Sequence, residues 1–345
     1  MYKPRSYGTT DRPLRTAVVG LGWWGAELIE RISASPRFHA VAGVDPSPNR
    51  TKLAMLNTHD MRHESTLDGV LGDSGVDAVM LATPHLLHAE QCMDVLASGK
   101  ELYCEKPLTL KAEDAEKVVE TCRRQDQVLG LGHVRRFESA YERVQQILDD
   151  GILGQLLFFE ANMSHDVFVH VDRSNWRLDP NQAPAGLMTS TGIHLTDLAV
   201  CFFGPAGEVR AQQSSIVMEP PVNDFVSASF TFRSGACGVI NLLSCTPYSG
   251  RVTIFGDKAW VEVVTEGNVD KGRPAILTLC TGTDEPRIRE TYEATDTLRQ
   301  IVDAWAAAIS GDEVYRFTYE QAVENIRLFD GIVRSAAADG RRILL

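Results

Sequence analysis

The chain has 345 residues, a length that predicts about two domains, and its 44% hydrophobic and 23% charged residues are typical of a globular protein. Its 34 Lys and Arg against 46 Asp and Glu give a net charge of −12, which argues against a nucleic-acid partner. The sequence has no run of 18 apolar residues, no apolar signal-peptide core near its start and no Cys-x-x-Cys pair among its seven Cys, so we expect a cytoplasmic protein without membrane contact, disulfide framework or metal.

The first half of the chain alternates short apolar runs with helical stretches, which is the pattern of βαβ units. Strands are predicted at residues 16–19, 38–44, 76–82, 101–104 and 128–132, and helices at 25–33 and 111–124. The strand runs are apolar without alternation, as in a parallel sheet that is covered on both faces. We therefore predict an α/β domain with a doubly wound parallel sheet over residues 14–133, preceded by a disordered or loosely attached segment, 1–13.

The second half, residues 134–345, begins with a predicted helix at 138–148 and is then mostly strand-like. Strands are predicted at 156–163, 208–214, 225–232, 238–244, 252–255, 260–264 and 276–279, and helices at 191–203, 297–309 and 319–337. Hairpin-length turns at 233–235 and 256–258 indicate an open, mainly antiparallel sheet. We predict an α+β domain for substrate binding and oligomerisation, with a last helix able to pack back on the first domain.

Gly20, Gly22 and Gly25 form a Gly-x-Gly-x-x-Gly motif between the first predicted strand and the first helix, with Trp23 and Trp24 inside it. Glycine at these positions lets the chain turn tightly and lets the backbone approach a pyrophosphate, which binds at the start of the helix. In this strand–turn–helix context the motif predicts a dinucleotide site of the Rossmann type.

Asp45 lies 20 residues after Gly25, at the end of the second predicted strand, where a carboxylate could bind both hydroxyls of the adenosine ribose. Its charge would repel a 2′-phosphate and favours NAD over NADP. Ser47 and Arg50 leave NADP open, because Arg50 could fold over the ribose and bind that phosphate. The alternative for Arg50 is a solvated helix residue.

Several further motifs carry a resemblance to a known family. They are Thr83-Pro84-His85 with His88, the segment from Gly99 to Glu105-Lys106-Pro107, Arg136-Phe137, the glycine-rich stretch from Gly186 to His194 and Asp197, and the ending 335–344. Together they resemble the Gfo/Idh/MocA family (glucose-fructose oxidoreductase, inositol dehydrogenase, rhizopine catabolism) from Arg15 to about Leu345. The resemblance implies an NAD(P)-dependent oxidoreductase acting on CH–OH groups, with its substrate between the nucleotide domain and the open sheet.

The resemblance also assigns residues. Lys106 and His194 serve the proton transfer, because a carbinol that loses a hydride must release its hydroxyl proton to a positioned base. The predicted cofactor contacts are Gly20, Gly22, Trp23, Trp24, Gly25, Asp45, Arg50, Thr83, Pro84, His85, His88, Glu105 and Lys106. The predicted substrate contacts are Trp176, Arg177, Ser190, His194 and Asp197, and weaker candidates are His133, Arg135, Arg136, His165 and His170. Trp176 offers a flat apolar face, and Arg177 a bidentate donor for a carboxylate or phosphate.

The sequence departs from the family pattern at Ser190, four residues before His194, where relatives commonly have Asp. A helix from residue 190 onward would place Ser190, His194 and Asp197 on one face. A hydroxyl cannot hold the Lys106 ammonium in its charged form as a carboxylate would, so we expect Lys106 to lose its proton more easily here. His85 stands where relatives often have Asn, so the family pattern does not fix its contact with the nicotinamide ribose. Asp197 either contacts substrate or orients His194.

The sequence thus predicts a dehydrogenase that transfers a hydride between the nicotinamide of NAD, or of NADP, and a secondary alcohol of a sugar, cyclitol or related cyclic polyol. One alternative is a dehydrogenase of cis-dihydrodiols or of hemiacetals of aromatic acids. Another is a glycoside-processing enzyme that retains NAD. A non-catalytic dinucleotide sensor is disfavoured because both Lys106 and His194 are present. Family members commonly pair through the antiparallel sheet, so a homodimer or homotetramer is expected.

Overall fold

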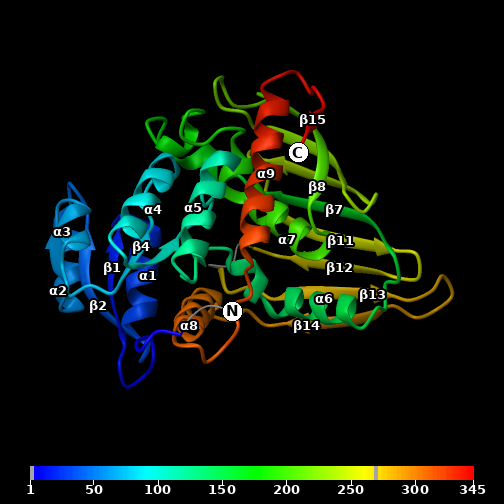
Figure 1. Cartoon of the computed structure of the whole chain (residues 1–345). Helices are drawn as coiled ribbons and strands as arrows, with labels where there is room; N and C mark the ends of the chain where they lie inside the picture. The colour runs from blue at the N-terminus through cyan, green and yellow to red at the C-terminus, as the bar shows by residue number, and fades with distance from the viewer. Residues whose placement is uncertain (1–3, 268–270) are drawn as a thin grey trace. The chain divides into compact units, whose positions relative to one another are not determined.

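A computed structural model describes residues 4–267 and 271–345, which divide into two compact units (Figure 1). Unit 1 runs to Gly132 and also contains Leu298–Val323. Unit 2 comprises His133–Thr297 and Glu324–Leu345. Within the described residues, no helix combines the length and the apolar character that crossing a membrane requires.

Unit 1 contains a six-stranded, wholly parallel sheet in the order β3-β2-β1-β4-β5-β6. The strands are β1 (Leu14–Val19), β2 (Phe38–Val44), β3 (Arg62–Glu64), β4 (Ala78–Leu81), β5 (Glu101–Cys104) and β6 (Gly130–Leu131). The helices are α1 (Trp23–Ser33), α2 (Arg50–Thr58), α3 (Asp68–Leu71), α4 (His88–Ala97), α5 (Ala112–Arg124) and α8 (Thr297–Ser310). The order reverses direction beside β1, which confirms the predicted doubly wound sheet.

Helix α8 comes late in the chain but belongs to the core of unit 1. The Trp305 ring lies 5.5 Å from the ring of Tyr103 and 6.3 Å from that of Phe38, between centroids. Its indole N–H donates to the carbonyl oxygen of Val128 at 2.9 Å. The sequence had placed residues 298–323 with the second domain, because a local pattern does not show which sheet a helix covers.

Residues 4–13, which precede β1, are bonded to unit 1, whereas the sequence predicts a disordered or loosely attached segment over 1–13; residues 1–3 lie outside the described part of the chain. Nε of Arg5 and the hydroxyl of Tyr7 each donate to the buried carboxylate of Glu101 at 3.0 Å. The backbone N–H of Arg5 also bonds the carbonyl oxygen of Ile309 at 2.8 Å. Burial of Glu101 makes these partners necessary, since a buried carboxylate needs hydrogen bonds.

Unit 2 is built on a nine-stranded sheet in the order β14-β13-β12-β11-β7-β10-β9-β8-β15. Its strands are β7 (Leu156–Ser164), β8 (Ala206–Ser214), β9 (Phe225–Phe232), β10 (Cys237–Leu243), β11 (Ser249–Gly256), β12 (Trp260–Thr265), β13 (Ala275–Cys280), β14 (Ile288–Tyr292) and β15 (Ile343–Leu344). Every pair is antiparallel except β7 with β10. The predicted mainly antiparallel α+β domain is confirmed.

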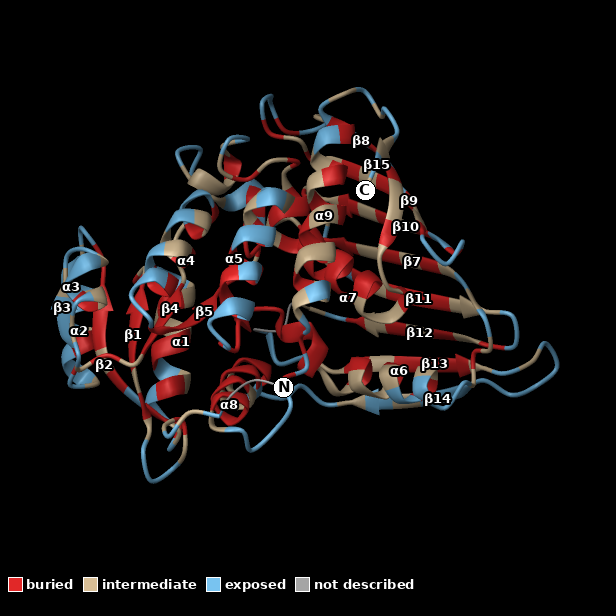
Figure 2. Cartoon of the chain, viewed as in Figure 1, coloured by how far each residue is buried: buried red, intermediate tan, exposed pale blue. Residues whose placement is uncertain are grey.

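Helices α6 (Ser139–Asp149) and α7 (Ile193–Phe203) pack on one face of this sheet, and α9 (Tyr319–Ala336) brings Gly331 against Val209 of β8. Burial alternates along the strands: in β12, Val261 and Val263 are buried, whereas Trp260 and Val264 are half-exposed (Figure 2). This period of two is the signature of a sheet covered by helices on one face only.

Candidate functional site

In the glycine-rich turn between β1 and α1, backbone atoms leave no room for a side chain at two of the glycines. At the third glycine there is room. Gly20 has a φ of +92°, which favours glycine, and a Cβ there would lie 2.7 Å from the carbonyl oxygen of Ala82. A Cβ at Gly25 would overlap the carbonyl oxygen of Gly20. At Gly22 an added Cβ would meet nothing within 4 Å. The turn therefore fits a dinucleotide, whose pyrophosphate could approach the main chain at Gly22.

Trp23 and Trp24 are the first residues of α1, directly after this open position. The side chain of Trp23 is 59% exposed, and its ring meets that of Trp24 edge-on with 5.3 Å between centroids. The structure thus places both tryptophans beside the turn, and their contact with the cofactor stays a prediction.

Asp45 directly follows β2, and each of its side-chain oxygens accepts a hydrogen bond. The backbone N–H of Ser47 donates to Oδ1 at 2.9 Å, and Nζ of Lys52 donates to Oδ2 at 2.6 Å. Burial acts to raise the pKa of Asp45, but the hydrogen bonds from Lys52 and Ser47 outweigh it and hold the pKa below its ordinary value. Arg50, the first residue of α2, is exposed. The Lys52 contact was not predicted.

Thr83, Pro84 and His85 connect β4 to the helices that follow. The hydroxyl of Thr83 donates to the side-chain oxygen of Gln91 at 2.6 Å, and His85 is buried in a short 3-10 turn. Gln91 is a partner that the motif did not reveal. Its bond fixes the Thr83 side chain at the carboxyl end of β4.

His88, the first residue of α4, joins two loops through its ring. Nδ1 lies 2.7 Å from the carbonyl oxygen of Pro107, and Nε2 lies 3.0 Å from that of Thr83. The ring is fully buried, and this desolvation lowers the pKa of His88 although both carbonyls oppose it. A neutral ring donates to one carbonyl, and Pro107 has the shorter contact. His88 was predicted to contact cofactor; its bonds instead favour a positioning role.

Glu105 and Lys106 follow β5, all four residues of which are buried. Lys106 is half-buried, and its backbone N–H donates to the Glu105 carboxylate at 3.3 Å. The Tyr103 hydroxyl lies 3.4 Å from the other carboxylate oxygen. Burial raises the pKa of Glu105 to about 7, although the neighbouring Lys106 ammonium and these hydrogen bonds oppose the rise. The residue before Lys106 is thus a carboxyl group that can be neutral near neutral pH.

The predicted residues of unit 1 gather at one sheet edge. Gly20, Asp45, Thr83 and Glu105 each come directly or one residue after a strand, and those strands, β1, β2, β4 and β5, are neighbours in the parallel sheet. The carboxyl ends of parallel strands meet at the same edge, where open α/β sheets bind their ligands.

In unit 2 the predicted helix 191–203 begins differently from expectation. A π-helical turn, Met188–Gly192, precedes α7. Ser190 lies inside that turn, and not on the α-helix that the sequence predicted for it. The Ser190 hydroxyl lies 3.5 Å from the carbonyl oxygen of Leu187 and from the hydroxyl of Thr191. Single π turns occur frequently at functional sites.

His194, the second residue of α7, is buried beside a second histidine. The rings of His194 and His133 meet edge to face with 5.6 Å between centroids. The side-chain amide of Asn325, on α9, lies 3.1 Å from Nε2 of His133, and its oxygen accepts the Thr196 hydroxyl at 2.6 Å. Because the amide nitrogen can only donate, Nε2 of His133 accepts and its proton is assigned to Nδ1.

Asp197 is held by a buried ion pair. Nε and a terminal nitrogen of Arg136 donate to its two oxygens at 2.8 and 2.7 Å, and both side chains are at most 5% exposed. Nδ1 of His133 lies 4.0 Å from the same carboxylate. This bidentate pair favours the alternative in which Asp197 orients its neighbours, since its oxygens are engaged by Arg136.

Trp176 and Arg177 form a stacked pair in a short 3-10 turn of unit 2. The guanidinium carbon lies 4.3 Å from the centroid of the Trp176 ring, and burial lowers the pKa of Arg177. The predicted flat face of Trp176 is therefore covered by Arg177 on one side.

Of the weaker histidine and arginine candidates, some lie beside His194 and others do not. His133 and Arg136 belong to the network beside His194, whereas Arg135 pairs with Glu138 at 2.8 Å. His165 lies 3.0 Å from the Thr191 hydroxyl, and His170 is exposed.

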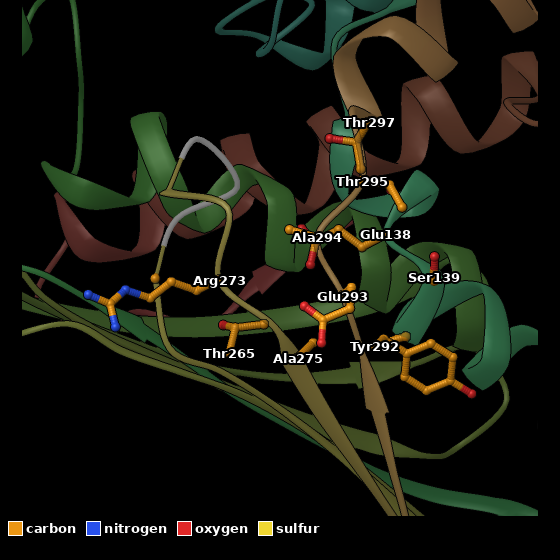
Figure 3. A pocket seen from close by; sticks show the side chains of 12 residues that line it. Glu138, Ser139, Thr265, Arg273, Ala275, Tyr292, Glu293, Ala294, Thr295 and Thr297 are labelled. Carbon is orange, nitrogen blue, oxygen red and sulfur yellow. The ribbon is translucent and has the colours of Figure 1, made fainter.

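A small cavity of about 30 Å³ lies between the start of α6 and the ends of β12, β13 and β14 (Figure 3). Its lining residues are Glu138, Ser139, Ala140, Thr265, Gly267, Arg273, Ala275, Tyr292, Glu293, Ala294, Thr295 and Thr297. None of the predicted site residues is among them. Across residues 4–267 and 271–345, no group of three His, Cys, Asp or Glu side chains is arranged to hold a metal ion.

Two family descriptions match the chain. Residues 14–133 match "Oxidoreductase family, NAD-binding Rossmann fold", and residues 141–262 match "GFO/IDH/MocA C-terminal domain". The 1,5-anhydro-D-fructose reductase of Ensifer adhaerens is 30% identical over 280 residues, which are 79% of this chain and 81% of that relative. The chain belongs to the Gfo/Idh/MocA family.

Two further similar proteins match less of the chain or match at lower identity. The D-xylose 1-dehydrogenase [NADP(+)] of Haloarcula marismortui is 31% identical over 193 residues, so the match spans 54% of this chain and about half, 53%, of that relative. The solved structure of a levoglucosan dehydrogenase with NADH and levoglucosan has a TM-score of 0.84 at 17% identity, over 96% of this chain and 99% of that chain. This last likeness shows the fold.

The chain thus belongs to an oxidoreductase family and has an NAD-binding Rossmann domain, and the unit 1 geometry fits that cofactor. The nicotinamide cofactor would be held by the glycine turn, Asp45 and the loops after β4 and β5. When bound it supplies a hydride acceptor or donor. The partners that sequence reasoning missed, Lys52, Gln91 and Asn325, act through side-chain bonds to predicted residues or their neighbours.

Proposed function

We propose that this chain transfers a hydride between the nicotinamide of NAD(P) and a secondary alcohol of a sugar, cyclitol or related cyclic polyol. The observation that carries the proposal is the presence of two groups suited to proton transfer. Lys106 is half-buried after β5, and His194 is buried at the start of α7. Two of the similar proteins are a xylose dehydrogenase and an anhydrofructose reductase, and their names support a sugar substrate.

The proton chemistry follows from the alcohol. When the carbinol C–H leaves as a hydride with its electron pair, the oxygen forms a C=O bond and its proton must go to a base. We assign that proton to Nζ of Lys106 or to a ring nitrogen of His194. The Arg136–Asp197 pair and Asn325 hold His133, whose ring lies against that of His194. In the reverse direction the same groups return the proton to the alkoxide.

The test is a screen of sugars, inositols, anhydrosugars and aromatic dihydrodiols with NAD⁺ and NADP⁺, following reduced nicotinamide. With the best substrate, Lys106→Ala and His194→Ala should each lower kcat by about 100-fold or more. Full activity in Lys106→Ala would refute the assigned roles. Glycoside breakdown without net NADH would replace the proposal by the NAD-retaining alternative.

Ser190→Asp tests the departure from the family pattern. If the missing carboxylate lets Lys106 lose its proton more easily in wild type, a carboxylate in the Ser190→Asp variant should raise the pKa of Lys106. The acidic limb of the pH–rate profile should then shift to higher pH. Ser190→Ala is the matched control and should leave that limb in place. An unmoved limb in both variants would exclude Ser190 from the proton-transfer route.

We also propose that the chain forms a homodimer or homotetramer through the sheet face of unit 2 that the helices leave half-exposed. Phe158 and Phe255 on that face have ring centroids 6.3 Å apart, and Trp260 lies on the neighbouring strand. Half-exposed aromatic residues are enriched at interfaces. Light scattering should give a mass of two or four chains, and Phe158→Arg should reduce it; a monomeric wild type would exclude this interface.

A further inference from the structure

The carboxylate of Asp45, which is predicted to favour NAD over NADP, already has hydrogen-bond partners within the chain. Its oxygens accept one hydrogen bond each, from the backbone N–H of Ser47 and from Nζ of Lys52. A carboxylate offers about four acceptor positions, so Lys52 occupies one of those that the adenosine ribose would otherwise use.

The charge at this position is also different from that of a lone aspartate. The Lys52 ammonium lies 2.6 Å from Oδ2 of Asp45, and the two side chains are 28% and 12% exposed. A cation in direct contact offsets the repulsion that the carboxylate alone would exert on a 2′-phosphate. The charge of Asp45 is therefore not by itself a reason for the site to exclude NADP.

Lys52 is anchored to the start of α2 by its backbone, and its side chain is bonded to Asp45 only through the ammonium. Its N–H donates to the side chain of Asn49, the residue that caps the start of α2, at 2.9 Å. The flexible four-carbon stem can swing the ammonium without disturbing the helix. The positive end of α2 favours a phosphate at the same place. Asp45 is held by His63, whose Nε2 lies 2.9 Å from the backbone oxygen of Asp45.

We propose that Lys52 is a specificity residue that lets this chain bind NADP⁺ as well as NAD⁺, its ammonium moving from Asp45 to the 2′-phosphate. With NADP⁺ bound, Lys52 pairs with the phosphate and Asp45 keeps its bond to Ser47. With NAD⁺ bound, Lys52 stays on Asp45 and the ribose hydroxyls take the remaining acceptor positions. The inference rests on the nucleotide site of the proposed function and not on its substrate.

The test measures binding by calorimetry with NAD⁺ and NADP⁺ and no substrate. Wild type should bind both, and Lys52→Met should weaken NADP⁺ binding about tenfold, the value of one hydrogen bond between charged groups, while the Kd for NAD⁺ stays within about twofold. Lys117→Met is the matched control, because Lys117 also pairs with a carboxylate, Asp114 at 2.9 Å, but on exposed α5. It should change neither Kd.

Two further variants keep the proposal falsifiable. Lys52→Gln should reproduce the selective loss if Lys52→Met disturbs α2, and Arg50→Met should cost less NADP⁺ affinity than either. The proposal is overturned if wild type does not bind NADP⁺, if Lys52 variants weaken both dinucleotides equally, or if only Arg50→Met is selective. Because no hydride is transferred, these results stand apart from the sugar screen, which can fail while the NADP⁺ discrimination holds.

Discussion

The two units build their parts of the candidate site by different means. In unit 1 the positions are set by the backbone: the glycine turn is closed at Gly20 and Gly25, and the other residues follow adjacent parallel strands. In unit 2 the surroundings of His194 are side chains from distant stretches of chain. His133 and Asn325, 192 residues apart, bond each other beside it.

This difference explains which half of the site a sequence reveals. A backbone-built site needs glycine or a strand end at fixed spacing, and that spacing is visible as a short motif. A network of buried side chains needs only that its members meet in space, so no local pattern records it. The two kinds of site should also fail differently when a residue is changed.

The largest effect is expected at the ion pair of unit 2. Arg136→Met leaves the Asp197 carboxylate buried without its guanidinium partner. Breaking a buried pair in this way costs about 3–5 kcal/mol of unfolding free energy, because the remaining charge is uncompensated. Urea unfolding followed by circular dichroism would measure the loss.

An exposed pair is the control for this prediction. Lys117→Met removes the same kind of charge from a pair with Asp114 at the surface of α5 and should leave the free energy of unfolding nearly unchanged. A loss below about 1 kcal/mol in Arg136→Met would mean that Asp197 finds another partner. The Arg136–Asp197 pair would then not be what stabilises the surroundings of His194.

The next effect concerns Glu105, a buried carboxyl group in the site of unit 1. Burial holds the pKa of Glu105 at about 7 in the folded chain, against 4.5 for an ordinary glutamate. Below the lower value both states are protonated and the contribution to stability is complete. As the pH rises toward 7 only the unfolded chain releases the proton, so the free energy of unfolding falls, by on the order of 3 kcal/mol.

Glu105→Gln removes this titration. The difference in unfolding free energy between wild type and Glu105→Gln should decrease from about pH 5 to about pH 7 and stay level above it. Glu113→Gln, an exposed change on α5, should show a level difference throughout. A level profile for Glu105→Gln as well would mean that the folded chain holds this carboxyl group charged.

Particular elements show where sequence reasoning succeeds. The strands at 38–44 and 101–104 have the predicted bounds. Both are short, mostly buried runs, as expected for strands of a parallel sheet that is covered on both faces. Helix α2 was missed, since Leu56 is its single buried residue and it therefore lacks an apolar face. The short edge strands β3 and β14 were missed for a related reason: their side chains are exposed or half-exposed.

The candidate site divides in the same way. The motifs predicted the glycine turn, Asp45, Glu105 and Lys106 at one sheet edge, since parallel strand ends meet there. They did not reveal Lys52 on Asp45 or Asn325 on His133. They also placed Ser190 on an α-helix, because a π turn has no sequence pattern that distinguishes it from the first turn of a helix.

The smallest effect, and the sharpest comparison, lies within the glycine turn itself. Gly25→Ala forces a Cβ against the carbonyl oxygen of Gly20 and should cost about 1–3 kcal/mol of stability. Gly22→Ala meets nothing within 4 Å, and the backbone of Gly22 (φ −73°, ψ −171°) accepts any residue, so its melting temperature should match wild type. Calorimetry with NAD⁺ should nevertheless show a several-fold higher Kd in Gly22→Ala, since its methyl group occupies the space through which the pyrophosphate approaches. An unchanged Kd together with an unchanged melting temperature would place the pyrophosphate elsewhere on the turn, and unit 1 would then owe its site to strand ends alone.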